Sequence, residues 1–274
     1  MPGERAEDAL EAGAAIAASG RGLLFTQLGE AVTSPVAAIA VRNHYLWLFD
    51  QICARKLPAH VSVKPTQLGL DLSFAECERH LLVLAAKAEQ TGSAIWLDME
   101  DSSYVDRTLE LYVTLKKRHP STGVALQAYL HRTPEDLSRL MPLKPVIRLV
   151  KGAYDEPKGV AHEKKTDTDR AYYTLAAQML DAARTGDCGP VFGTHDLALI
   201  ARIAERAAET GVGKGKYQNH MLYGIRDSAQ RRLVAEGHSV KTLISYGAAW
   251  YRWYMRRLAE RPANVLFVVK SIFG

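Results

Sequence analysis

Residues 146–152 read Val-Ile-Arg-Leu-Val-Lys-Gly, a short apolar run that carries two cations and ends at a glycine. Runs of this length and composition are typical of buried strands. Similar runs lie at residues 22–29, 60–64, 94–100, 124–130, 190–195, 216–222 and 239–246. Amphipathic segments with helical spacing separate them, as at 74–91 and 171–185. Eight strand-like units, each followed by a helix, predict an α/β fold, the (β/α)8 TIM-type barrel, with a doubly wound open sheet as the alternative.

Composition excludes several classes of protein. The chain has 274 residues, 47% of them hydrophobic, with 35 basic and 30 acidic side chains. This balance does not fit a disordered chain, and three separated cysteines do not fit a disulfide-stapled domain. We expect reduced thiols, a cytoplasmic location and one continuous domain over 1–274. The charges are interspersed, which favours a mixed solvated surface over a nucleic-acid partner.

Polar residues gather where the predicted strands end. In a barrel of this kind, chemistry takes place at the carboxyl ends of the strands. The residues at those ends are Glu30, Lys64, Asp98, Glu100, Gln127, Arg148, Lys151, Thr194 and His195. Each one alone could be a salt-bridged rim residue, but together they predict an active site.

A second feature is the aromatic segment 248–260, which carries the adjacent cations Arg256 and Arg257. Two neighbouring guanidinium groups suit a carboxylate or a phosphate. A solvated basic face of the helix is the alternative. Metal chemistry has less support, since none of the nine histidines falls in an HxH or HExxH pattern. We predict no metal site, although a metal-dependent barrel using Asp98, Glu100 and His195 stays an alternative.

Several blocks of the sequence resemble the proline dehydrogenases, flavoenzymes of proline catabolism. The matching strings are VSVKPTQLGLDLS (61–73), WLDMEDS (96–102), ALQAYLHRT (125–133), RLVKGAYDEP (148–157), GTHD (193–196), MLYGIR (221–226) and YGAAWYRWYMRRLAERPANVLF (246–267). The resemblance implies a (β/α)8 barrel with a displaced final helix and an FAD bound without a Rossmann fingerprint. The family's extra N-terminal helices, which precede the barrel, have no counterpart in the match.

The resemblance also implies residue roles. Arg148 would lie beside the flavin N5, Gln127 would bond the flavin ring, and Asp98 would orient a cation or a water. The other implied cofactor contacts are Met99, Val150, Lys151, Gly152, Ala153, Tyr154, Lys165, Thr168, Thr194, His195 and His220, with Asp169 and Tyr172 in the same K-x-x-T-D-x-x-Y string. Lys64, Arg256 and Arg257 would hold the substrate carboxylate, and Glu30 would pair with Arg256 as a gate. Leu222, Leu243 and Tyr246 complete the implied substrate site.

Three sets of positions depart from the family pattern. Leu243 replaces a tyrosine that packs on the substrate ring, residues 218–220 read Gln-Asn-His in place of Glu-Phe-Gln, and Thr26 replaces an aspartate. In a closed barrel these positions fall on one arc of the wall. The sequence therefore predicts FAD-dependent oxidation of L-proline, or of a close cyclic analogue such as a hydroxyproline, an N-substituted or a six-membered ring, to the imine. A catalytically silent binding module is the remaining alternative.

The electron acceptor is open at this point. The resemblance implies a membrane quinone and peripheral contact with the inner face of the membrane. Oxygen or a protein partner fits the residues equally well.

Overall fold

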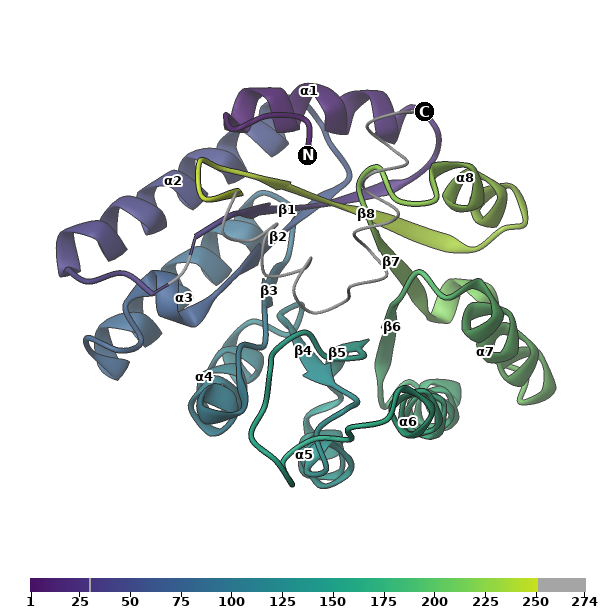
Figure 1. The fold of residues 1–274 in the computed structure, drawn as a ribbon. Helices are drawn as coiled ribbons and strands as arrows, with labels where there is room; N and C mark the ends of the chain where they lie inside the picture. Colours follow the sequence, from purple (N-terminus) through teal and green to yellow (C-terminus); the bar gives the residue numbers. More distant parts are fainter. Residues whose placement is uncertain (30, 251–274) are drawn as a thin grey trace, which may run out of the picture.

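The computed structural model describes residues 1–29 and 31–250. Eight parallel strands close into a barrel in the order β1 to β8, surrounded by helices (Figure 1). The strands are β1 (Gly22–Gln27), β2 (Ala59–Val63), β3 (Ile95–Leu97), β4 (Gly123–Gln127), β5 (Val146–Val150), β6 (Gly189–Gly193), β7 (Gln218–Leu222) and β8 (Ser239–Tyr246). Each overlaps one run predicted from the sequence. Because β1 pairs with β8, the barrel is confirmed and the open sheet is wrong.

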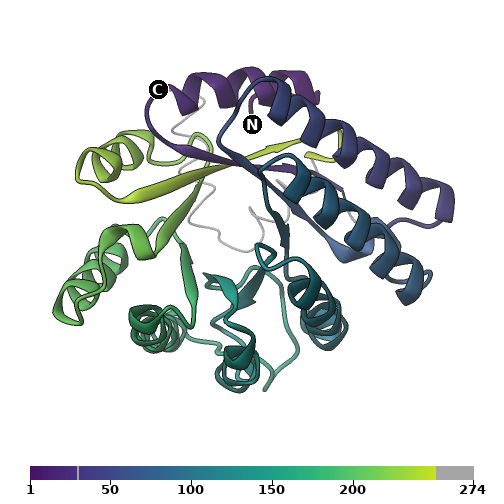
Figure 2. The same ribbon diagram turned by 180° about the vertical axis from the view of Figure 1, so that it is seen from behind.

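The helices join successive strands and cover the outside of the barrel, as the view from behind also shows (Figure 2). They are α2 (Pro35–Ala54), α3 (Phe74–Gln90), α4 (Val105–Arg118), α5 (Thr133–Leu140), α6 (Lys165–Thr185), α7 (Leu197–Glu209) and α8 (Asp227–Ala235). Local signals fix several of their ends. Ser34 caps α2 by accepting a hydrogen bond from the amide of Ala37, and Pro35 begins the helix. Gly186 ends α6 in the left-handed conformation.

One helix, α1 (Ala6–Ala17), precedes the barrel and is not among the elements predicted from the sequence. It lies outside β1 and β8 (Figure 1). A Cβ at Gly13 would come within 2.7 Å of the Phe25 ring, so α1 packs closely on β1. α1 thus covers the apolar outer faces of β1 and β8, which need an apolar partner.

Side chains alternate along each strand between the helices and the barrel interior. On β5, Ile147 and Leu149 are buried in the main hydrophobic core, whereas Arg148 points inward. Polar side chains within these mainly apolar runs, such as that of Arg148, therefore point into the barrel interior.

Part of the predicted site lies outside the described residues. Glu30, Arg256 and Arg257 fall there, as does most of the predicted final helix at 248–260. The described portion ends at Trp250, whose indole Nε1 donates to Glu4 at 2.7 Å. None of the helices within 1–29 and 31–250 is both long enough and apolar enough to cross a membrane.

Candidate active site

An ion pair lies inside the barrel toward the carboxyl ends of β3 and β5. Arg148 is 5% exposed, and its Nη2 donates to Asp98 Oδ1 and, at 3.1 Å, to Ser62 Oγ. Ser62 Oγ in turn donates to the same Asp98 oxygen at 2.7 Å. Three strands thus hold one guanidinium in a fixed orientation. The predicted catalytic residues Asp98 and Arg148 are in direct contact.

The guanidinium rests on an indole. Arg148 Cζ is 5.3 Å from the centroid of Trp96, a cation–π distance. The Trp96 ring also contacts the His220 ring edge to face at 5.3 Å between centroids. A Cβ at Gly123 would lie 2.4 Å from the Trp96 ring, so only glycine fits at that position of β4 without a shift. Trp96 therefore forms a packed floor beneath Arg148.

Two of the buried polar atoms that have no hydrogen-bond partner within the described chain are a donor on β5 and an acceptor on the neighbouring strand β4. They are Arg148 Nη1 and Gln127 Oε1. Gln127 ends β4, and its Nε2 donates to the carbonyl of Glu100 at 3.2 Å, which fixes the amide. An unsatisfied donor and an unsatisfied acceptor each disfavour burial unless a ligand pairs with them. The edge of a flavin ring offers both acceptors and a donor, so these two groups fit FAD.

Lys151, just after β5, links two helices. Its Nζ donates to Asp169 on α6 and, at 3.1 Å, to Asp196, whose carboxylate caps α7. Lys165 donates to the other Asp169 oxygen. Burial opposes ionisation of Asp169 and Asp196, but the bonds from Lys151, with Lys165 at Asp169, outweigh it and lower the pKa of both carboxyls. Lys151 is thus a positioned cation at the rim.

The loop after β5 is held by an aromatic ring. Gly152 has φ of +127°, and a Cβ there would lie 2.3 Å from the Tyr129 ring. The Tyr129 hydroxyl donates to Glu156 Oε1 at 2.9 Å, and the amide of Ser102 donates to the same oxygen at 3.0 Å. The predicted cofactor residues Val150, Gly152, Ala153 and Tyr154 therefore lie in one short, anchored stretch beside Lys151.

The three departures from the family pattern lie on adjoining strands. Leu243 on β8 is in register with Leu222 of β7 and with Leu24 of β1. Thr26 is buried, is in register with Ser245, and its side chain interacts with the Tyr45 hydroxyl. The expectation that these positions fall on one arc of the barrel wall is confirmed, because β7, β8 and β1 are neighbours in the closed barrel.

His195, which follows β6, borders this arc at β7. Its Nε2 accepts a hydrogen bond from the amide of Leu222 at 2.8 Å, which joins the end of β6 to β7. Thr194, next to it, accepts from the amide of Asp196 at 3.2 Å. Both predicted cofactor residues are held at the carboxyl end of β6.

Other predicted residues lie away from this group. Tyr246 is 1% exposed and packs in the core between β8 and α2, where its hydroxyl lies 2.7 Å from His44 Nε2. Met99 is buried in the same core, and Tyr172 donates to the carbonyl of Leu149 at 2.9 Å. Thr168, buried on α6, lies near the carbonyl of Lys164. Met99 and Tyr246 each follow an inward-facing residue, Asp98 and Ser245. Because side chains alternate between the two faces, those of Met99 and Tyr246 point to the outer core.

Glu100 does not join Asp98 as a cation ligand. It accepts hydrogen bonds from the amide and hydroxyl of Thr66, at 3.1 and 2.6 Å. Burial raises its pKa, although the Thr66 bonds and the charge of Lys64 oppose that rise. Lys64 itself follows β2 as predicted and is half-buried. With Asp98 bound to Arg148 and His195 bound to β7, the geometry does not favour the metal-dependent alternative.

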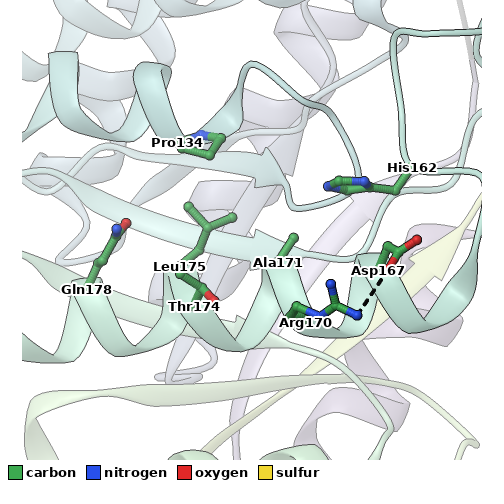
Figure 3. A pocket seen from close by; sticks show the side chains of 8 residues that line it. All are labelled: Pro134, His162, Asp167, Arg170, Ala171, Thr174, Leu175 and Gln178. Atoms are coloured by element: carbon green, nitrogen blue, oxygen red, sulfur yellow. Dashed lines mark ion pairs between the residues drawn. The ribbon is translucent and has the colours of Figure 1, made fainter.

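A separate groove of about 390 Å³ lies outside the barrel between α5 and α6 (Figure 3). Side chains of α6 line one side, and Pro134 and His162 line the other. Arg170 is joined there to Asp167 at 3.3 Å. The groove is distant in the fold from the inner face of the strands, so the Arg148 group is the better candidate.

Sequence reasoning missed Ser62, Trp96, His60 and Lys241, which all contact this group or its floor. Their spacing in the sequence could have identified them, because each lies an even number of residues from a predicted site residue of the same strand and therefore on the same face. Trp96 and Asp98 illustrate this spacing on β3.

A closed parallel barrel with a buried cation and a carboxylate toward the carboxyl ends of its strands defines a (β/α)8-barrel enzyme. Comparison with known proteins narrows this class. Residues 9–270 match the family model described as Proline dehydrogenase. This chain belongs to the proline dehydrogenase family.

Named relatives cover almost all of the chain. It is 35% identical over 273 residues to Proline dehydrogenase 1 of Bacillus subtilis (strain 168), covering 99% of this chain and 89% of that protein. It is 36% identical over 281 residues to Proline dehydrogenase of Deinococcus radiodurans, covering 99% and 88%.

Solved structures share the fold. Proline utilization A from Bdellovibrio bacteriovorus, inactivated by N-propargylglycine, superimposes with a TM-score of 0.86 at 23% identity, over 94% of this chain and 31% of that one. Proline utilization A from Bradyrhizobium japonicum, as its D779Y mutant, gives a TM-score of 0.77 at 22% identity, over 93% and 30%. The chain thus spans about a third of these larger proteins, and at this identity the likeness concerns the fold.

Proposed function

We propose that this chain oxidises L-proline, or a close cyclic analogue, to the corresponding imine with FAD as the oxidant. The observation that carries the proposal is the buried Arg148, fixed by Asp98 and Ser62, whose Nη1 has no partner within the described chain; on the neighbouring strand β4 the Gln127 amide oxygen is likewise unpartnered there. Family membership and the names of the relatives support the same reaction.

FAD, when bound, supplies the two-electron acceptor for a hydride from the substrate. Arg148 and Gln127 would hold its ring, and the Lys151 group would hold its charged portion. Lys151 is well suited to a phosphate because Asp169 and Asp196 already position its ammonium. The loop residues Gly152, Ala153 and Tyr154 and the pair Thr194 and His195 complete this set, with Lys165 at its exposed edge.

The substrate carboxylate would be bound by cations. Among the described residues, Lys64 at the end of β2 is one such cation. Arg256 and Arg257 are proposed to join it, with Glu30 paired with Arg256 as a gate. Arg148 places a permanent positive charge where negative charge develops on reduction, an electrostatic contribution that usually dominates catalysis. Asp98 keeps that cation oriented and is not needed as a base.

The distal wall argues for a substrate other than unmodified proline. Leu243 offers no hydroxyl or ring, and the neighbouring strand β1 contributes the polar side chain of Thr26. A polar side chain beside an apolar one suits a ring that carries its own polar group. A hydroxyproline fits this description.

A substrate panel tests the proposal. The purified protein is scanned for flavin absorption and then mixed anaerobically with L-proline, hydroxyprolines, and six-membered and N-substituted analogues. Bleaching of the flavin by one of these compounds supports the enzyme. Normal efficiency on L-proline alone would show that the altered wall does not change the substrate, and a colourless protein that FAD cannot reconstitute would favour the silent module.

We further propose a cytoplasmic protein that passes electrons to a quinone at the inner face of the membrane. No nucleic-acid partner is proposed. Reoxidation rates of the reduced flavin with a soluble quinone, with oxygen and with quinone in vesicles would rank the acceptors.

A further inference from the structure

Three side chains from β2, β3 and β8 form a hydrogen-bonded chain inside the barrel beneath Arg148, and we call them the inner triad. The Trp96 indole Nε1 donates to His60 Nδ1 at 3.1 Å. His60 Nε2 lies 3.2 Å from Lys241 Nζ. Trp96 is 2% exposed, and the other two are half-buried toward the opposite end of the barrel from the active site. None of these contacts belongs to the site proposed above.

The hydrogen-bond pattern fixes the protonation of the inner triad. An indole N–H can only donate, so His60 Nδ1 must carry no proton. A neutral imidazole then has its proton on Nε2, which donates to Lys241 Nζ. An ammonium has no lone pair to accept that bond, so the pattern is complete only when Lys241 is a neutral amine.

The surroundings make the neutral form of Lys241 easier to reach than that of a solvated lysine. Burial lowers the pKa of Lys241 to about 8 and that of His60 to about 3, with the charge of Lys241 contributing at His60. The facing titratable groups are His60 from β2 and His220 from β7, while β1 presents Gly22, over which the lysine stem packs. Within the described chain Lys241 has no carboxylate partner to hold it charged. Arg148, above Trp96, adds a further positive charge.

The inner triad is connected to the active site through Trp96. One face of the indole carries the Arg148 guanidinium, and Gly123 leaves no room for the ring to move toward β4. The bond from Nε1 to His60 fixes the remaining rotation of the ring. Any change at His60 therefore alters the surface on which Arg148 rests.

We propose that His60 and Lys241 are positioning residues for Arg148, which hold the Trp96 indole in place when Lys241 is neutral and release it when Lys241 is protonated. This inference rests on the proposed function only in giving Arg148 its role in the reaction. On protonation, one proton from solvent binds Nζ, and the ammonium donates to His60 Nε2. The imidazole proton must then lie on Nδ1, opposite the indole N–H, and that hydrogen bond is lost.

The direct test is a titration of the Trp96 indole that needs neither flavin nor substrate. Protein labelled with ¹⁵N in the tryptophan indole is followed by NMR from pH 6.5 to 9.5, and the Trp96 signal is assigned by its absence from Trp96→Phe. We expect one titration step near pH 8 in the native chain and none in Lys241→Met. A native signal that does not titrate, or one that still titrates in Lys241→Met, would overturn the proposal.

His60→Asn provides a second variant in case Lys241→Met does not fold. Its amide oxygen can accept from Trp96 Nε1 without a tautomer to switch, so its Trp96 signal is expected to stay constant over the same range. The exposed Lys158 supplies the control, since Lys158→Met leaves the native titration step in place. Loss of the step in that control would contradict an effect specific to Lys241.

A pH profile of activity then connects the inner triad to Arg148. We expect the kcat/KM of Lys241→Met, divided by that of the native enzyme, to fall by up to about tenfold as pH rises from 7 to 9. This factor equals the increase in the neutral fraction of one group with a pKa of about 8. A ratio independent of pH would refute the positioning role. Absence of any turnover with a normal NMR titration would instead refute the proposed function.

Discussion

Ser62 Oγ donates a 2.7 Å hydrogen bond to Asp98 Oδ1, the same oxygen that receives Arg148 Nη2. A serine thus supports an ion pair whose partners lie 50 positions apart in the sequence. Because Arg148 is 5% exposed, the pair has little access to water, and its charges interact strongly. The orientation of this cation is the main structural requirement of the proposed site.

Replacing the carboxylate of this pair tests that requirement. Asp98→Asn leaves a buried guanidinium without its counter-charge, and we expect a loss of about 2–3 kcal/mol in the free energy of unfolding, less than for a fully buried pair because Asp98 is 19% exposed. We also expect kcat to fall at least about tenfold, as one charged hydrogen bond is worth more than 1.4 kcal/mol. Denaturant unfolding and steady-state kinetics measure the two effects.

Asp106 on α4 is the matched control, since its side chain is 76% exposed in its pair with Arg132. Asp106→Asn should stay within about 0.5 kcal/mol of the native protein. Equal effects at both positions would contradict a special role for Asp98.

Lys151→Met should weaken FAD binding by about tenfold or more, because Asp169 and Asp196 would face the cofactor phosphates without their cation. Flavin titration of the apoprotein measures the dissociation constant. Lys158→Met, an exposed lysine in the same loop region, should bind FAD as the native chain does. Unchanged affinity in Lys151→Met would place the phosphates elsewhere.

Leu243→Tyr should shift the preference toward unmodified L-proline by about tenfold, because the larger side chain fills the space that a substituted ring would use. The ratio of kcat/KM for L-proline and for the preferred analogue measures the shift. Leu243→Met conserves volume and should leave this ratio within about twofold. A ratio unchanged in Leu243→Tyr would remove Leu243 from the specificity wall.

The free energy of unfolding should fall as pH decreases below 6.5. Burial lowers the pKa of His60 to about 3, and burial together with Arg148 holds the pKa of His220 well below its usual value. Both stay neutral in the folded protein while the unfolded chain binds their protons, so each contributes a loss of up to about 1.4 kcal/mol per pH unit.

Urea unfolding at pH 7 and pH 5.5 measures this dependence. His60→Asn should reduce the slope with pH, whereas His131→Asn, at an exposed position, should leave it unchanged. A slope in His60→Asn equal to the native slope would show that His60 takes up a proton in the folded state.

The carboxyl ends of the strands illustrate how far local sequence goes. Each apolar run became a strand, and Asp98, Gln127, Arg148 and Lys151 reached one end of the barrel, because parallel strands in a closed sheet bring corresponding ends together. The runs at β3 and β4 ended earlier than expected, at Leu97 and Gln127, since the polar residues that follow leave the ladder to form loops.

The face of each side chain could not be assigned so simply. Tyr246 is next to the inward Ser245, and its predicted place beside the substrate is instead a place in the core against His44. A one-residue change in register moves a side chain to the other face of a sheet, and apolar runs buried on both sides do not reveal which face is which.

The amino-acid sequence by itself determined the eight-unit barrel, its strand positions and the family, because these depend on local periodicity and on motifs that stay contiguous in the chain. The tertiary structure alone decided that α1 covers β1 and β8, and that Lys241 meets His60 across 181 positions. Such contacts arise only when the barrel closes, since closure brings β8 beside β1 and turns both side chains toward the same interior.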